Sequence, residues 1–130
     1  MRHHYNRLLE LNTGVQKKSN VVRNLITSLV ENKRVTTTPK RAKVLKYETE
    51  KLFAKLVRTY NRYENKEDSL REVSKIILSN TFGGDRIVKK VIEDKLLPYI
   101  EEWRTSGFVR TYRVWTRVGD AAEKFLVELV

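Results

Sequence analysis

The spacing of apolar residues changes along this chain, and no other sequence feature restricts the fold as much. Between residues 19 and 97 apolar side chains recur at helical intervals, whereas residues 108–130 alternate or are rich in β-branched and aromatic side chains. The first pattern is typical of amphipathic helices and the second of strands. We therefore expect an α+β fold with a helical body of about four helices, a small mixed three-stranded sheet and an extended basic N-terminal arm.

The first helix is predicted to begin after Ser19, whose hydroxyl suits an N-cap, and to end at Lys33 and Arg34. Cations at that end face the negative pole of the helix dipole. Its apolar positions form one wide stripe, at Val21, Val22, Leu25, Ile26, Leu29 and Val30. A stripe of this kind is the face that an amphipathic helix packs against a core.

A short strand and a second helix are predicted next. Residues 35–38 are β-branched throughout, which favours a strand. Thr38-Pro39 is a strong helix start, because Thr suits the N-cap and Pro the first helical position. This helix is predicted to run to about Tyr60, with six core-facing positions: Ala42, Leu45, Leu52, Phe53, Leu56 and Tyr60.

Two more helices are predicted before the last strands. A polar connection over residues 61–68 precedes a shorter helix around residues 70–77, and Phe82-Gly83-Gly84 ends it. A fourth helix is predicted to end before Pro98, since a proline removes a helical hydrogen bond. Residues 98–107 are then expected to form a loop.

The last two strands are predicted over residues 108–117 and 125–130, joined by a turn at 118–120. They are expected to pair antiparallel, with residues 35–38 as a third strand. Asp120 is interpreted as a turn residue that accepts a backbone hydrogen bond.

Simple alternation within the first of these strands separates its side chains between two faces. It places Phe108 and Tyr112 on one face and Arg113 and Trp115 on the other. Trp115 suits either an RNA surface or the core, and Trp103 is expected in the core.

The positive charge is concentrated near the start of the chain. Residues 1–46 contain eleven Lys/Arg and two acids, a net charge of +9, whereas residues 47–130 carry only +2. A second excess lies at residues 103–117, which hold four arginines and no acid. A total of +11 favours a polyanionic partner, either nucleic acid or an anionic membrane surface.

Several classes of function are not expected. The chain has no Cys, which excludes disulfides and thiolate zinc sites. Gly83-Gly84 lacks the spacing and the Lys of a phosphate-binding loop. The acidic pairs at 67–68 and 101–102 diverge if helical, so they do not suggest a catalytic pair. We expect no enzyme activity, cofactor or metal site, and regard His3-His4 as an RNA contact.

The chain also lacks an apolar run of the roughly 20 residues that a membrane span needs. No apolar stretch follows the first seven residues, so they do not resemble a secretory signal. We expect a cytoplasmic protein, or one from which a targeting segment has already been removed.

Residues 1–18 are interpreted as a basic RNA-binding arm, separate from a single α+β domain over 19–130. They show no sustained period and are expected to become ordered on a partner. Cations would pair with phosphates and histidines would stack on bases. The alternative is a solubilising tail. The residues concerned are Arg2, His3, His4, Arg7, Lys17 and Lys18.

Three further groups of residues are candidate RNA contacts. Arg23 and Asn24 lie beside the first apolar stripe; Arg110, Arg113 and Arg117 lie in the predicted strand. The third group opens the second helix, where cations at the positive helix pole are unfavourable unless an anion binds. A merely solvated face is the alternative in each case. The helix-start group comprises Lys40, Arg41, Lys43 and Lys46.

An ordered set of short motifs spans nearly the whole chain. The motifs are Met1-Arg2-His3, Leu11-Asn12, Arg23-Asn24-Leu25, Ser28-Leu29-Val30, Thr37-Thr38, Ala42-Lys43, Gly107-Phe108, Arg110, Arg117-Val118-Gly119-Asp120-Ala121-Ala122 and Val127-Glu128-Leu129-Val130. In this order they resemble the bacterial large-subunit ribosomal protein seventeen family. Ser106 replaces a usual glycine, Phe108 replaces a usual tyrosine, and residues 61–86 match poorly.

The resemblance implies a structural protein of the large ribosomal subunit. It would bind large-subunit ribosomal RNA near the peptide exit tunnel and contact neighbouring ribosomal proteins. A bacterial or an organellar ribosome would fit. The alternatives are a free nucleic-acid-binding regulator that recognises duplex DNA and a protein that binds anionic membranes.

Overall fold

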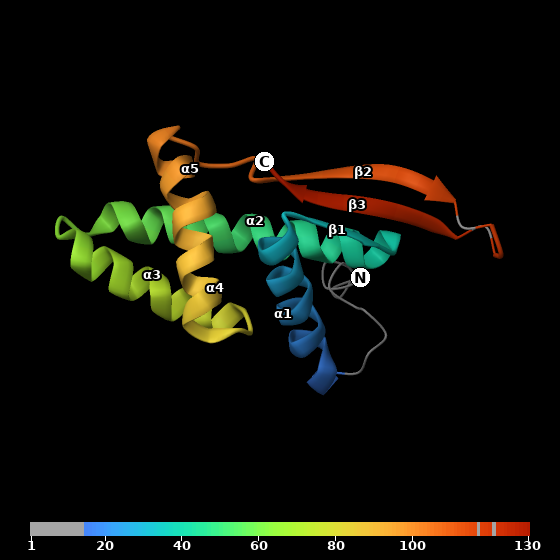
Figure 1. Cartoon of the computed structure of the whole chain (residues 1–130), viewed down its shortest axis with the longest axis horizontal. Helices are drawn as coiled ribbons and strands as arrows, with labels where there is room; N and C mark the ends of the chain where they lie inside the picture. Colours follow the sequence, from blue (N-terminus) through green and yellow to red (C-terminus); the bar gives the residue numbers. More distant parts are fainter. Residues whose placement is uncertain (1–14, 117, 121) are drawn as a thin grey trace, which may run out of the picture.

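The computed structural model describes residues 15–116, 118–120 and 122–130 (Figure 1). It confirms the predicted α+β class. The elements, in chain order, are α1 (Val15–Asn32), β1 (Arg34–Thr37), α2 (Pro39–Arg62), α3 (Lys66–Asn80), α4 (Gly84–Val91), the π-helix η2 (Ile92–Leu96), α5 (Leu97–Glu101), β2 (Val109–Thr116) and β3 (Glu123–Leu129).

The three strands form one sheet in the order β1-β3-β2, and both pairings are antiparallel. The prediction of a third strand is confirmed, but the prediction of a mixed sheet is wrong. β2 reaches β3 through a short turn, so the two strands must run in opposite directions. β1 pairs with the other edge of β3, also antiparallel. Figure 1 shows the β2–β3 hairpin extending past the helices.

Helix α1 begins at Val15, so Ser19 lies inside the helix and is not its N-cap. Gln16 and the lysines after it are straight-chain residues with good helix propensity, which allows the helix to extend upstream. The last four residues of the predicted arm are therefore helical. After α1, Lys33 adopts a left-handed conformation with φ 67°, and its carbonyl accepts a hydrogen bond from Leu129 N at 3.0 Å.

Helix α2 begins at Pro39, as predicted, and runs to Arg62. Thr38 makes no side-chain cap, although its carbonyl accepts the first helical hydrogen bond from Ala42 N at 2.9 Å. The predicted core face is confirmed. Five of its residues are buried, Ala42, Leu45, Leu52, Phe53 and Leu56, and Tyr60 packs against them partly buried.

Helix α3 follows α2 after a connection of only three residues, because Asn65 caps it by accepting a hydrogen bond from Glu67 N at 3.0 Å. The predicted polar connection over 61–68 was therefore too long. Gly83 lies between α3 and α4 and interrupts the helical backbone there, as expected, with φ 113°. A Cβ at this position would collide with Ile87, so both the backbone and the space require glycine.

The predicted helix end before Pro98 is wrong, since the path continues through η2 and α5 to Glu101. Within η2, Leu97 N donates to Ile92 O, five residues back. In a regular α-helix a proline lacks one backbone hydrogen bond and its ring clashes with the carbonyl four residues back. The wider turn of η2 moves the preceding backbone away from the ring of Pro98, so the helical path continues. The loop therefore begins after Glu101 rather than at Pro98.

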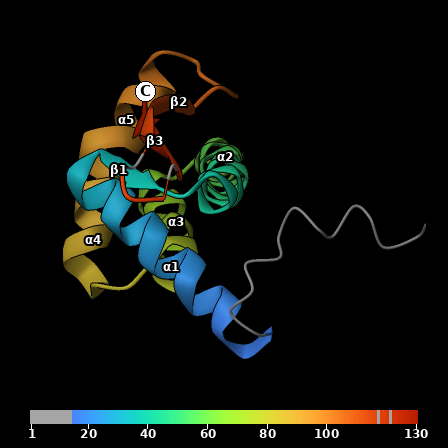
Figure 2. The same ribbon diagram turned by 90° about the vertical axis from the view of Figure 1, so that its right-hand side faces the viewer.

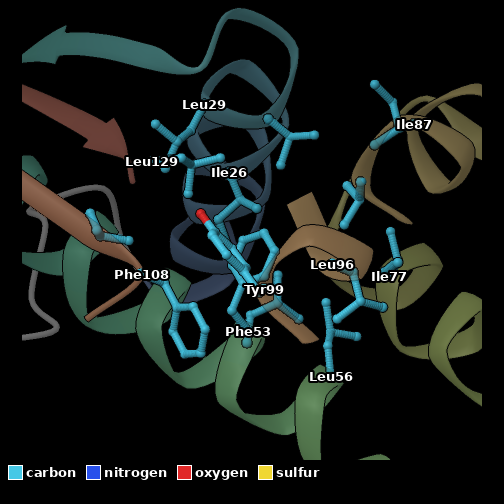
Figure 3. Packing of buried hydrophobic residues seen from close by; sticks show 14 of the residues in the cluster. Ile26, Leu29, Phe53, Leu56, Ile77, Ile87, Leu96, Tyr99, Phe108 and Leu129 are labelled. Atoms are coloured by element: carbon cyan, nitrogen blue, oxygen red, sulfur yellow. The ribbon is translucent and has the colours of Figure 1, made fainter. Parts of the chain in front are cut away.

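The core lies between the sheet and the helices, with buried side chains from α1, α2, α3, α4, η2 and α5. Phe53, Tyr99 and Phe108 form its aromatic centre, with ring centroids 5.1 to 5.8 Å apart. Figure 3 shows these rings together with Ile26, Leu29 and Leu129. The prediction that Trp103 belongs to the core is wrong, because its side chain is 89% exposed.

Candidate nucleic-acid interface

The cationic group at the start of α2 is largely solvent-exposed. Lys40, Lys43 and Lys46 are exposed and Arg41 is half-buried. A helix rises about 1.5 Å per residue, so the four cations lie within roughly 9 Å along the axis. The first turn of α2 contains no acid that would offset them. The start of α2 therefore presents cations and the positive pole of the helix dipole to the same solvent region.

One face of α2 extends this cationic surface beyond the residues predicted from the sequence. Lys40, Lys43, Tyr47 and Lys51 recur at helical intervals of three and four residues and so share a face. The ammonium of Lys51 lies 5.9 Å from the centre of the Tyr47 ring, which is 45% exposed. The helical spacing in the sequence was sufficient to identify Tyr47 and Lys51.

The arginines of β2 are held on the sheet by carboxylates of β3. Arg110 Nη2 lies 3.3 Å from Glu128 Oε1, and Arg113 Nη2 lies 3.2 Å from Glu123 Oε1. All four side chains are partly exposed, so these pairs orient the guanidinium groups more than they stabilise the fold.

A register shift in β2 overturns the predicted division of its faces. Arg113 pairs with Phe125, but Trp115 pairs with Lys124, which leaves one extra residue between them. Arg113 therefore lies on the core-side face with Phe125, whereas Trp115 lies on the opposite face with Lys124. Trp115 is 52% exposed and does not belong to the core.

The start of α2 and the hairpin lie at the same end of the molecule (Figure 1). Figure 2 looks along α2 from this end. The side chain of Glu50 connects the two elements, because its Oε1 accepts a hydrogen bond from Val109 N at 2.8 Å. We call β1, residues 39–51 of α2 and the β2–β3 hairpin the basic end.

Arg23 has contacts within the fold. Its Nη2 donates to Thr81 O at 3.0 Å, and its guanidinium carbon lies 4.1 Å from the centre of the Phe82 ring. These contacts join α1 to the end of α3. The predicted RNA contact of Arg23 remains untested, and the structure provides a different role for the side chain. Asn24 is exposed on α1.

The remaining candidates are placed only in part. Arg2, His3, His4, Arg7 and Arg117 lie outside the described residues. Lys17 and Lys18 belong to the first turns of α1. The interpretation of the predicted turn is confirmed: Asp120 Oδ1 accepts a hydrogen bond from Ala122 N at 3.1 Å.

The opposite side of the molecule has a different charge. Residues 64–102, which we call the acid-leaning end, contain nine acids and seven Lys/Arg, so their net charge is −2. They form α3, α4, η2 and α5, and α3 lies farthest from the hairpin in Figure 1. A groove of about 530 Å³ separates α3 from η2 and α5, and Glu93 and Glu101 contribute to its lining.

Two groups with shifted pKa values bind the same carbonyl beneath the sheet. Tyr99 Oη donates to Val130 O at 3.0 Å, and Lys95 Nζ donates to it at 3.2 Å. Burial raises the pKa of Tyr99 to about 12. Burial, followed by the charge of Lys33, lowers the pKa of Lys95. Neither side chain belongs to the basic end, so the two pKa shifts concern the stability of the fold and not the binding of RNA.

Within the described residues, no three His, Cys, Asp or Glu side chains gather to hold a metal ion. No helix in this part of the chain has the length and apolar character needed to cross a membrane.

Comparisons with known proteins match almost the whole chain. The family model for ribosomal protein L17 matches residues 21–130. A protein of Fervidobacterium nodosum named large ribosomal subunit protein bL17 is 31% identical, covering 100% of this chain and 99% of the relative. Relatives of the same name from Thermotoga neapolitana and Thermotoga maritima are each 34% identical, covering 100% of this chain and 95% of the relative. The chain therefore belongs to the ribosomal protein L17 family.

Proposed function

We propose that this protein is a structural constituent of the large ribosomal subunit that binds and stabilises large-subunit ribosomal RNA near the peptide exit tunnel. Family membership over residues 21–130 carries the proposal. The relatives' shared name, large ribosomal subunit protein bL17, supports the particle. The neighbourhood of the tunnel rests on the family resemblance. The role is structural rather than enzymatic, and the protein acts within the ribosome.

The basic end supplies the RNA-binding chemistry. Its cations neutralise phosphates and release condensed counterions, which provides affinity without requiring a base sequence. The fold sets the spacing of these cations before binding, because α2 and the sheet share one core. The described contacts that we propose are Asn24, Lys40, Arg41, Lys43, Lys46, Arg110 and Arg113.

The sequence extends this set beyond the described side chains. Arg2, His3, His4 and Arg7 lie in the arm, and three further cations complete the set: Lys17, Lys18 and Arg117. Deletion of residues 1–14 removes arm residues and keeps every described residue of α1. We expect this truncated protein to keep the melting temperature of the full chain and to lose a competition with it for incorporation into the subunit. Equal incorporation would contradict a role for the arm.

Neighbouring ribosomal proteins are proposed to contact the acid-leaning end. Its net charge of −2 repels the RNA backbone, whereas basic protein segments are attracted to it. The groove between α3 and α5 provides an apolar floor at Leu70, Leu97 and Ile100 for such a segment.

Sedimentation through a sucrose gradient tests the proposed function. The tagged full-length protein should migrate with the large subunit and remain there at moderate salt. A second tagged variant, with Lys40, Lys43 and Lys46 changed to Gln, should appear more in the unbound fractions. If the unmodified protein is absent from the large-subunit fraction, the proposal fails. Selective binding to duplex DNA at moderate salt would instead favour a free regulator, and binding to anionic vesicles would favour a membrane protein.

A further inference from the structure

The outward face of the sheet is defined by the strand register. Along β3, the side chains of Lys124, Leu126 and Glu128 lie on one face, opposite the face of buried Val127 and Leu129. Residues paired across an antiparallel sheet share a face. β1 adds Arg34 and Thr36 to the outward face, and β2 adds Arg110, Tyr112 and Trp115.

The register shift after Arg113 is what brings the two aromatic rings of β2 together on this face. Tyr112 pairs with Leu126 and Trp115 pairs with Lys124, and these two β3 residues are successive positions on the same face. Without the extra residue, Trp115 would point to the core side, where Thr116 lies now. The bulge therefore turns the ring of Trp115 outward beside that of Tyr112.

These rings are accessible and lie in a cationic setting. Tyr112 is 43% exposed and Trp115 is 52% exposed. The paired positions of this face carry three cations, Arg34, Arg110 and Lys124, against the single carboxylate of Glu128. Figure 1 shows α1 and α2 on the other side of the sheet. The outward face thus combines flat rings with positive charge.

We infer that this outward face stacks unpaired RNA bases on Tyr112 and Trp115 while Arg34, Arg110 and Lys124 hold the adjoining phosphates. Every base has a π-face, whereas bases inside a duplex are already stacked on one another, so exposed rings favour single-stranded segments. This inference rests on the proposed function and specifies its partner: loops or bulges of ribosomal RNA, rather than uninterrupted duplex.

The two tryptophans of the chain allow stacking to be observed directly. The Trp103→Phe variant leaves Trp115 as the only tryptophan, and Trp115→Phe leaves Trp103, which follows α5 just after the acid-leaning end. A single-stranded RNA oligomer of mixed sequence should quench the fluorescence of Trp103→Phe protein strongly, because a stacked base lies against the indole. It should leave the fluorescence of Trp115→Phe protein nearly unchanged. A duplex RNA of the same length should quench neither.

Affinity provides the second measurement. Trp115→Ala and Tyr112→Ala should each weaken binding of the single-stranded oligomer on the order of 10-fold, and duplex binding by less than about 2-fold. Neither change removes a cation, so the salt dependence should keep its slope. Trp103→Ala is the matched control and should bind both RNAs like the unmodified protein. Thermal melting of each variant checks that it is folded.

The outcomes separate this inference from the proposed function. If Trp103→Phe protein binds both RNAs without quenching of Trp115, and Tyr112→Ala has no effect on affinity, base stacking is refuted and phosphate binding stands. If the protein binds neither RNA at low salt, the proposed function itself fails and the inference fails with it.

Discussion

The starts of α2 and α3 obey opposite electrostatic rules. The first turn of α3 carries Glu67 and Asp68 after Lys66; the two acids suit the positive pole of a helix, and Asn65 caps it. The first turn of α2 carries Lys40 and Arg41 after Pro39, contains no acid and receives no side-chain cap from Thr38. The α3 start serves the stability of the fold. The α2 start weakens it, and a bound anion would offset the conflict.

The same contrast extends to the two ends of the molecule. At the acid-leaning end, two cations of α3 are paired with acids of the same helix, Arg71 with Asp68 at 3.9 Å and Lys75 with Glu72 at 3.2 Å. At the basic end, Arg110 and Arg113 are paired with acids of the next strand, and the first turn of α2 contains no acid. Departure from local electrostatic rules therefore marks the surface proposed to bind RNA.

The largest expected effect compares four cations at each end. Changing Lys40, Arg41, Lys43 and Lys46 to Gln should lower RNA affinity on the order of 100-fold at physiological salt, and reduce the slope of log K against log salt by roughly 3. The free protein should become more stable by about 1 kcal/mol, since like-charged groups leave the helix pole. Binding titrations at several salt concentrations and thermal unfolding measure both.

A control with the same change in charge is available at the acid-leaning end: Lys66, Arg71, Lys75 and Lys89 changed to Gln. This variant should bind RNA within about 3-fold of the unmodified protein, because these cations lie far from the proposed surface. Equal losses of RNA affinity in the two quadruple variants would show that net charge alone determines binding, and the proposed difference between the two ends would be wrong.

Arg23 tests where the RNA surface stops. Arg23→Ala removes the hydrogen bond to Thr81 O and the contact with the Phe82 ring, and should lower the free energy of unfolding by about 2 kcal/mol. RNA affinity, measured where the variant is folded, should not change. The neighbouring Asn24→Ala should change stability by less than about 0.5 kcal/mol. Loss of RNA affinity in folded Arg23→Ala protein would add Arg23 to the RNA surface.

Tyr99 tests stability beneath the sheet, away from either charged surface. At pH 8, Tyr99→Phe should lower the free energy of unfolding by about 1 kcal/mol, because a hydrogen bond to Val130 O is lost. The folded protein holds the phenol proton to a pKa of about 12, whereas the unfolded chain loses it near 10.0. Rising pH in this interval therefore favours unfolding of the unmodified protein only. The stability gap to Tyr99→Phe should narrow between pH 10 and 12, and a constant gap would contradict the buried phenol.

The smallest expected effects come from exposed ion pairs. Lys75→Ala and Arg113→Ala each break a pair at 3.2 Å between partly exposed side chains, so each should change stability by only a few tenths of a kcal/mol. Only Arg113→Ala should weaken RNA binding, by about 5-fold. Chemical denaturation and binding titrations of the two proteins make the comparison.

The sequence predicted what depends on local patterns. The core face of α2, its start at Pro39 and the cluster of cations there follow from residues near one another in the chain. The errors have tertiary causes. Trp103 seemed a core residue by type alone, and the helix passes Pro98 because η2 changes the hydrogen-bond pattern before it. The outward position of Trp115 depends on the register with β3, which no local pattern specifies.

The central place of β3 has a consequence for how the molecule is made. β1 and β2 flank β3 and do not pair with each other, so neither has a strand partner until residues 123–129 have been synthesised. Val127 and Leu129 also complete the core beneath the sheet. During translation, the apolar faces of α1 and α2 therefore stay partly uncovered until β3 has been made. The sheet forms only when β3 emerges.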